Sequence, residues 1–149
     1  MKKFAIASLI ALAATAASAV EVGVTATRDY AGTDRTGGGI TVGQKFGAVG
    51  LTAGLERTTQ GSEDQNRLSL TGSVDVARFE RATFAVKGGV AHLDNQRSAD
   101  GYALFAGAGV SVPVAKQVSL TADVVRQYGQ DRVSQFDGNR FTVGVKYGF

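Results

Sequence analysis

The feature that most constrains this chain is a repeated alternation of apolar and polar residues. Near the C-terminus, for example, Val143 and Val145 alternate with Thr142, Gly144 and Lys146. A period of two is that of a β-strand, whose successive side chains point to opposite faces of a sheet. The pattern therefore predicts an all-β chain in which every strand has one apolar and one polar face.

The alternation occurs in eight segments. The predicted strands are residues 20–28, 39–46, 49–57, 66–77, 82–93, 102–112, 118–128 and 138–149. Short connections follow every second segment, at residues 47–48, 78–81 and 113–117, and longer polar ones lie at residues 29–38, 58–65, 94–101 and 129–137. An even number of strands of ~10 residues, with short turns at one end and longer loops at the other, is typical of an antiparallel up-and-down transmembrane β-barrel.

The N-terminus predicts export. Lys2 and Lys3 precede an uncharged apolar run, residues 4–14, and Ala17-Ser18-Ala19 has the small residues of a cleavage site. These are the parts of a secretory signal peptide. A membrane anchor is the alternative, but the apolar run is shorter than the ~20 residues that a spanning helix needs. We therefore expect a signal peptide at residues 1–19 and a barrel at residues 20–149.

Composition excludes several classes of protein. The chain has no cysteine and one histidine, so no disulfide scaffold, cysteine metal site, other metal site or cofactor is expected. The formal charge of +3 includes two signal-peptide lysines, and the remaining +1 leaves no basic surface for nucleic acid. His92 is the only histidine, and the alternation places it on the apolar face, where an amphipathic ring suits a membrane interface. We therefore expect no enzymatic activity.

The polar faces carry four acidic and four basic residues among Gly, Ser and Thr. These candidate interior ion-pair residues are Glu21, Lys45, Glu56, Asp75, Lys87, Asp123, Arg140 and Lys146. Eight strands enclose an interior just wide enough for side chains, where charges must be paired. The sequence therefore predicts a polar plug of ion pairs, and a narrow pore is the alternative.

Strand adjacency predicts where these charges meet. Glu21 begins the first strand, and Lys45 and Lys146 end its two neighbours in a closed antiparallel sheet. We expect these three to cluster near the short-turn end, with Asp75, Lys87 and Asp123 nearby. Glu56 and Arg140 are expected nearer the long-loop end.

Aromatic residues at both strand ends favour a lipid-facing barrel. Phe46, Phe84, Tyr147 and Phe149 lie at the short-turn end, and Tyr30, Tyr102 and Tyr128 lie at the long-loop end. Such positions match the interfacial aromatic girdles of membrane barrels. The same apolar face would also suit the core of a soluble periplasmic barrel that binds a small hydrophobic ligand.

Three arginines extend the apolar face at the long-loop end. Arg28, Arg57 and Arg126 continue the outward parity of their strands beyond the last apolar residue. A guanidinium there could bind the phosphates of lipopolysaccharide bidentately. Snorkelling or pairing with nearby acidic residues is the alternative.

The chain ends on an alternating apolar run with a final phenylalanine. The residues of this run are Phe141, Val143, Val145, Tyr147 and Phe149. It resembles the C-terminal signature of bacterial outer-membrane barrels, and residues 20–149 resemble the small eight-stranded barrels of the OmpA transmembrane-domain and OmpX type. The resemblance implies recognition by the barrel assembly machinery and a monomeric barrel in the Gram-negative outer membrane, in contact with its lipids. It also implies a structural or surface-interaction role, although tryptophan, which many girdles contain, is absent.

Overall fold

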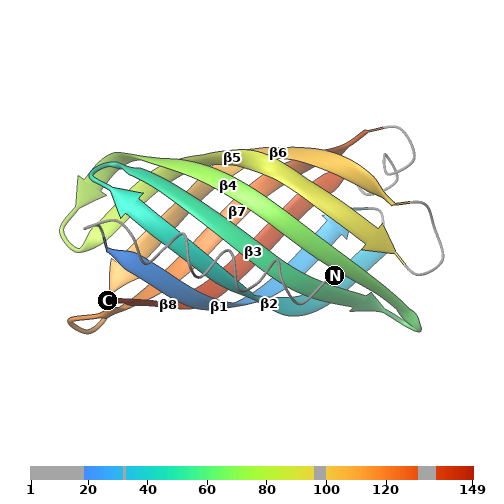
Figure 1. Cartoon of the computed structure of the whole chain (residues 1–149), viewed down its shortest axis with the longest axis horizontal. Coiled ribbons are helices and arrows are strands. Elements are labelled where there is room, and N and C mark those ends of the chain that lie inside the picture. Colours follow the sequence, from blue (N-terminus) through green and yellow to red (C-terminus); the bar gives the residue numbers. More distant parts are fainter. Residues whose placement is uncertain (1–18, 32, 96–99, 131–136) are drawn as a thin grey trace.

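The computed structural model describes residues 19–31, 33–95, 100–130 and 137–149, which form a closed antiparallel barrel (Figure 1). Its strands are β1 (Val20–Ala31), β2 (Thr33–Phe46), β3 (Val49–Gln60), β4 (Glu63–Phe79), β5 (Ala82–Asn95), β6 (Gly101–Pro113), β7 (Val118–Gly129) and β8 (Gly138–Gly148). Each strand pairs with its neighbours in the sequence, and β8 pairs with β1. The predicted up-and-down barrel of eight strands is confirmed. Most of the expected signal peptide lies outside the described residues.

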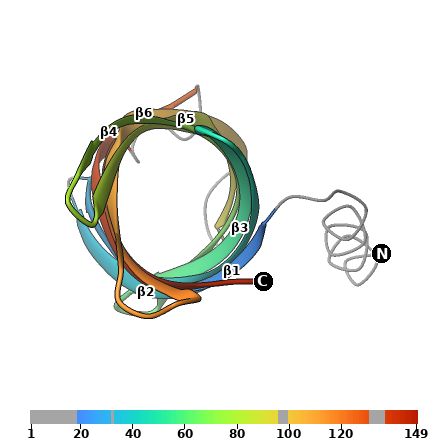
Figure 2. The same ribbon diagram turned by 90° about the vertical axis from the view of Figure 1, so that its left-hand side faces the viewer.

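Pairing between the first and last strands closes the sheet into a ring (Figure 2). The register runs from Glu21 opposite Gly148 to Tyr30 opposite Asn139. Closure provides the outer strands of the sheet with hydrogen-bonding partners, so the paired lengths of β1 and β8 present no free edge to the surroundings.

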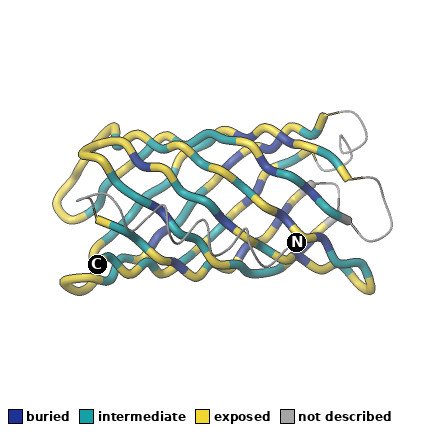
Figure 3. Tube along the Cα trace, in the orientation of Figure 1, coloured by how far each residue is buried: buried dark blue, intermediate teal, exposed yellow. Residues whose placement is uncertain are grey.

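The apolar faces point outward. Along β8, Phe141 is 42% exposed whereas the adjacent Arg140 is 4% exposed. The same alternation of buried and exposed positions runs along the other strands (Figure 3). In a soluble barrel the apolar face fills the interior, whereas in a membrane barrel it faces lipid, so the observed orientation is that of a membrane barrel.

Exposed aromatic side chains lie at both ends of the outer face, as the sequence predicted. They are Tyr30, Tyr102 and Tyr128 at the long-loop end and Phe46, Phe84, Tyr147 and Phe149 at the short-turn end. Phe79, at the end of β4, adds a further exposed ring to the short-turn end. No helix in the described part of the chain is long and apolar enough to cross a membrane.

Two of the predicted long loops are wrong. Residues 29–31 and 33–38 continue β1 and β2, with Ala31 opposite Thr33, and residues 58–65 form a hairpin in which Gln60 lies opposite Glu63. Both stretches lose the apolar alternation because their two faces are polar, but the backbone ladder continues. The other two long connections fall largely on residues 96–99 and 131–136, outside the described residues.

A glycine with a left-handed backbone shapes the short turn between β2 and β3. Gly47 has φ of 63°, and a Cβ added there would meet nothing within 4 Å. The requirement for glycine is therefore conformational, because an L-residue in this region is disfavoured by ~1–2 kcal/mol.

We predict that Gly47→Ala lowers the free energy of unfolding by about 1 kcal/mol. The measurement is urea-induced unfolding of the barrel in lipid vesicles. Gly148→Ala is the matched control, since a Cβ there also meets nothing within 4 Å but its φ is not positive. Equal stability of the two variants would contradict the backbone account.

Candidate functional site

The inward face of the barrel brings the eight predicted charged residues into the lumen and adds four more. The added side chains are Asp29, Arg35, Glu63 and Arg67. The resulting six acidic and six basic groups all lie within ion-pair distance of an opposite charge. Each charge in the described lumen is therefore balanced by an opposite charge. This pairing lowers the desolvation free energy of enclosing so many charges in a narrow space.

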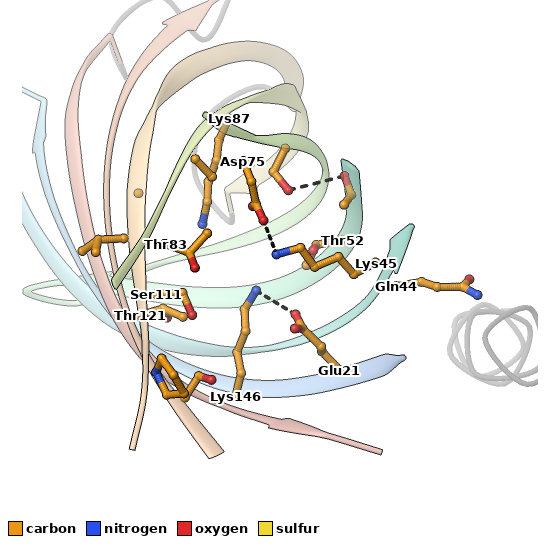
Figure 4. Close-up of a pocket in the computed structure, with 17 residues that line it drawn as sticks. Glu21, Gln44, Lys45, Thr52, Asp75, Thr83, Lys87, Ser111, Thr121 and Lys146 are labelled. Carbon is orange, nitrogen blue, oxygen red and sulfur yellow. Dashed lines mark hydrogen bonds and ion pairs between the residues drawn. The ribbon is translucent and has the colours of Figure 1, made fainter. Parts of the chain in front are cut away.

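The half of the lumen near the short turns uses only lysine as its base. We call this set the lysine tier, and its pairs are Lys45–Asp75 (Nζ to Oδ2, 2.6 Å), Lys146–Glu21 (Nζ to Oε2, 3.2 Å) and Lys87–Asp123. All of these residues except Asp123 line a cavity of about 210 Å³, together with Ser and Thr hydroxyls (Figure 4). Such a polar cavity has room for several water molecules. The side chains of this tier are 16–34% exposed, so their pairs face a hydrated space.

The expected cluster of Glu21, Lys45 and Lys146 forms only in part. All three side chains line the same cavity, but only Lys146 pairs with Glu21, and Lys45 pairs with Asp75. The residue opposite Lys45 on β3 is Gly50. Because Gly50 has no side chain, Lys45 can extend across β3 to the carboxylate on β4.

Another inward glycine makes room for the pair between Lys87 and Asp123. The two charged residues lie on β5 and β7, and their side chains meet over Gly109 on the intervening β6. A Cβ at Gly109 would overlap Asp123 Oδ1 and lie 2.9 Å from Lys87 Cε. This glycine is needed for close approach rather than for an unusual backbone conformation.

The half of the lumen near the long loops uses only arginine. We call the buried set Arg35, Arg67 and Arg140, with their acidic partners, the arginine tier. Arg140 Nη2 lies 2.8 Å from Glu56 Oε2, and its Nη1 lies 3.3 Å from Asp29 Oδ2. Arg67 Nη1 lies 3.8 Å from the same Glu56 oxygen. One carboxylate thus serves two guanidinium groups, a geometry that the planar arginine fork allows.

Apart from Glu63, which is 39% exposed, the arginine tier is more deeply buried than the lysine tier. The side chains of Arg140, Arg67, Glu56 and Asp29 are 4–12% exposed. Thr27 Oγ1 donates a hydrogen bond of 2.5 Å to Glu56 Oε1. Removing one member of such a buried, multiply bonded group leaves its partner charged and desolvated.

A small cluster of buried apolar residues lies in the same half of the barrel. Its members are Ala91, Leu93, Ala103, Phe105 and Val125, on β5, β6 and β7. The Arg67 guanidinium lies over the Phe105 ring, 4.8 Å from its centroid. A second cavity, of about 110 Å³, lies between the two tiers and is lined by residues of both. The lumen is therefore packed toward the long loops and more open toward the short turns.

The residues that sequence reasoning missed have an identifiable signal. Asp29 lies two positions beyond the inward Thr27, and Arg67 lies two positions before the inward Ser69. Arg67 lies within the predicted strand of residues 66–77, so the parity of that strand already places it inward, whereas finding Asp29 requires the strand of residues 20–28 to be extended by one residue. Arg35 could not be found in this way because residues 33–38 were expected to be a loop.

The three outward arginines differ in their partners. Arg28 Nη2 lies 2.7 Å from Asp34 Oδ2, and Arg57 pairs with Asp64. Among the residues that the structure describes, no carboxylate forms an ion pair with Arg126, whose guanidinium lies 5.7 Å from the centroid of the Tyr128 ring. The alternative of pairing with nearby acidic residues therefore holds for Arg28 and Arg57.

The residues of the predicted C-terminal signature all face outward. They are Phe141, Val143, Val145, Tyr147 and Phe149, each at least 40% exposed. The backbone N–H of Phe149 donates to Val20 O at 3.0 Å, and the rings of Tyr147 and Phe149 lie 4.9 Å apart. The end of the chain is therefore tied to the start of β1.

His92 lies on the side of β5 that faces away from the lumen. Its ring centroid is 5.0 Å from that of Tyr102 on β6, at the long-loop end. Within the described residues, no three His, Cys, Asp or Glu side chains are grouped so that they could hold a metal ion. The geometry brings no second catalytic group to this histidine among the contacts described.

Comparison with known proteins identifies the architecture. Neisserial surface protein A matches with a TM-score of 0.70 and 14% identity, over 88% of this chain and 96% of its own. The Ail protein of Yersinia pestis matches with a TM-score of 0.59 and 14% identity, over 89% and 97%. A de novo designed transmembrane β-barrel matches with a TM-score of 0.60 and 17% identity, over 89% and 96%. The fold is that of a small eight-stranded transmembrane β-barrel.

The relationship is visible in structure and not in sequence. No protein-family model matches the chain, and no curated protein matches it. At the identities found, the likeness defines the fold alone, and the role of this chain has to be argued from its own residues.

We predict that the two tiers differ in what they contribute to stability. Arg140→Met leaves Glu56 and Asp29 buried with too few partners and should lower the free energy of unfolding by ~3–5 kcal/mol. Lys146→Met removes a hydrated pair and should cost about 1 kcal/mol or less. Urea unfolding of each variant in lipid vesicles measures both values. Equal losses would contradict the division into a buried and a hydrated tier.

A second prediction concerns Gly109. Gly109→Ala should displace the ion pair that passes over it and lower the free energy of unfolding by about 1 kcal/mol. Gly88→Ala, on the outer face, is the control, because a Cβ there meets only Phe105 O at 3.5 Å. If Lys87→Met and Gly109→Ala have additive effects in a double variant, the two residues are uncoupled and the account of this glycine is wrong.

Proposed function

We propose that the chain is a monomeric outer-membrane barrel of a Gram-negative envelope with a structural or surface-interaction role and no catalytic activity. The observation that carries the proposal is the separation of an apolar outer face from a fully ion-paired lumen. An outward apolar face on a closed barrel is stable only where lipid covers it. We infer export through the signal peptide at residues 1–19 and recognition of the C-terminal run by the barrel assembly machinery.

The same arrangement supports a plugged interior. The arginine tier and the Phe105 cluster fill the long-loop half of the lumen, and their charges have partners within the barrel. A permeating ion would have to displace buried pairs, which is costly in a low-dielectric interior. The more open lysine tier supports water entry from the short-turn end and does not by itself supply a continuous path.

The barrel is expected to contact outer-membrane lipids over its whole outer face. The exposed aromatic residues at both ends suit the two membrane interfaces. Of the three arginines at the long-loop border, Arg28 and Arg57 are paired with Asp34 and Asp64, so we propose Arg126 as the one whose guanidinium meets the phosphates of lipopolysaccharide. Nucleic acid is not among the partners that we propose.

Fractionation of cells tests the outer-membrane assignment. We expect the protein in the outer-membrane fraction, extracted only by detergent and migrating differently on gels before and after heating. Release by osmotic shock without detergent would contradict the assignment and would favour a soluble periplasmic barrel.

Planar-bilayer recording tests the plug. We predict that the purified barrel produces no discrete, reproducible openings, because the arginine tier closes the lumen. Reproducible openings that Lys146→Ala abolishes would show conduction through this lumen and would favour the narrow pore.

A further inference from the structure

Arg126 differs from the other outward arginines in what surrounds it. Its guanidinium is exposed, lies over Tyr128, and has no acidic partner among the described residues. Arg28 likewise lies over Tyr30, but Arg28 and Arg57 are paired with Asp34 and Asp64. A guanidinium oriented by an aromatic ring keeps its planar fork for a phosphate or carboxylate. This position therefore has unused capacity to bind an anion at the membrane border.

The residues that lie beside Arg126 on the outer face are unusually small. Arg126 is opposite Ala106, which is opposite Gly88, which in turn is opposite Gly72. We call these four residues the Arg126 row. Three strand spacings of ~4.8 Å give the row a length of about 14 Å.

Larger side chains border the Arg126 row on both sides. The bordering residues are Leu70, Val90, Leu104 and Tyr128 toward the long loops, and Val74, Val86, Ala108 and Val124 toward the short turns. Apart from Ala108, each of them is 46–55% exposed. The row therefore forms a shallow depression between two ridges of larger side chains, of which the one toward the short turns is interrupted at Ala108.

Neither glycine of the Arg126 row is required by the backbone. A Cβ at Gly72 would meet only Gly88 O at 3.8 Å, and a Cβ at Gly88 would meet only Phe105 O at 3.5 Å. Neither residue has a positive φ. Larger residues would fit at both positions without disturbing the barrel. The fold therefore does not require the depression, and a function can account for it.

The Arg126 row descends from the membrane border toward the middle of the barrel. Arg126, Ala106, Gly88 and Gly72 lie three, five, seven and nine residues from the long-loop ends of β7, β6, β5 and β4. The cation is thus at the border, and the uncharged floor leads away from it into the apolar belt. A phosphorylated, acylated lipid has the same order of charge and hydrocarbon.

We propose that the Arg126 row binds one lipopolysaccharide molecule, with a lipid A phosphate on Arg126 and an acyl chain along Ala106, Gly88 and Gly72. The proposal rests on the outer-membrane assignment, which puts the long-loop end in the outer leaflet. Lipopolysaccharide is the phosphorylated lipid of that leaflet, and the charge of Arg126 complements its phosphate.

Native mass spectrometry of the folded barrel in detergent micelles, titrated with lipid A, tests the site. We expect Arg126→Ala to lower the affinity about tenfold, as loss of a charge-assisted contact would. The Gly72→Leu and Gly88→Leu double variant should fill the depression and weaken binding several-fold. Arg57→Ala is the charge control and Ala122→Leu the control for added bulk on the outer face, and both should bind like the wild type.

Two further titrations separate the possible outcomes. Dephosphorylated lipid A should bind the wild type as weakly as intact lipid A binds Arg126→Ala. Phosphatidylglycerol binding as tight as that of lipid A, or equal losses in Arg126→Ala and Arg57→Ala, would overturn the site. A wild-type protein that stays soluble without detergent would instead contradict the outer-membrane assignment. A folded, micelle-bound barrel that does not prefer lipid A over phosphatidylglycerol would contradict only the site.

Discussion

The hydrogen-bonded closure between β1 and β8 is the constraint on which the rest of the structure depends. In hydrocarbon an unpaired backbone N–H or C=O costs several kcal/mol, so a spanning sheet has to close on itself. Closure separates the lumen of the barrel from its outer surface. Because side chains along a strand alternate with a period of two, successive residues face the lumen and the outer surface in turn. Apolar side chains then have to face lipid, and every inward charge has to find its partner within a narrow lumen.

The lumen meets that second requirement in two different ways. Toward the short turns, lysines form single pairs with carboxylates beside a cavity of about 210 Å³. Toward the long loops, Arg140 and Arg67 share Glu56 in a nearly solvent-free network capped by Phe105. Lysine is a compact, well-hydrated charge, whereas arginine can serve several acceptors at once. The type of basic residue thus matches the hydration of each half of the lumen, with lysine in the hydrated half and arginine in the buried half.

The strands could be predicted from the sequence because lipid enforces the alternation, and β8 is the clearest example. The prediction failed at residues 33–38 and 58–65, where the barrel extends past the apolar belt and polar residues occupy both faces. The inward charges followed from parity, but their pairing did not. Lys45 pairs with Asp75 rather than Glu21 because Gly50 leaves a path across β3, which only the register of three strands reveals. The Arg126 row likewise depends on the register of four strands.

The central claim is that alternate residues of each strand face lipid and a polar lumen. The chain has no cysteine, so single-cysteine variants along β8 can each carry one nitroxide label in a lipid bilayer. Collision rates with oxygen and with a water-soluble nickel chelate report the environment of each label. The account predicts oxygen maxima with a period of two, at Phe141, Val143, Val145 and Tyr147. Chelate maxima at those positions, or no periodicity along the strand, would contradict it.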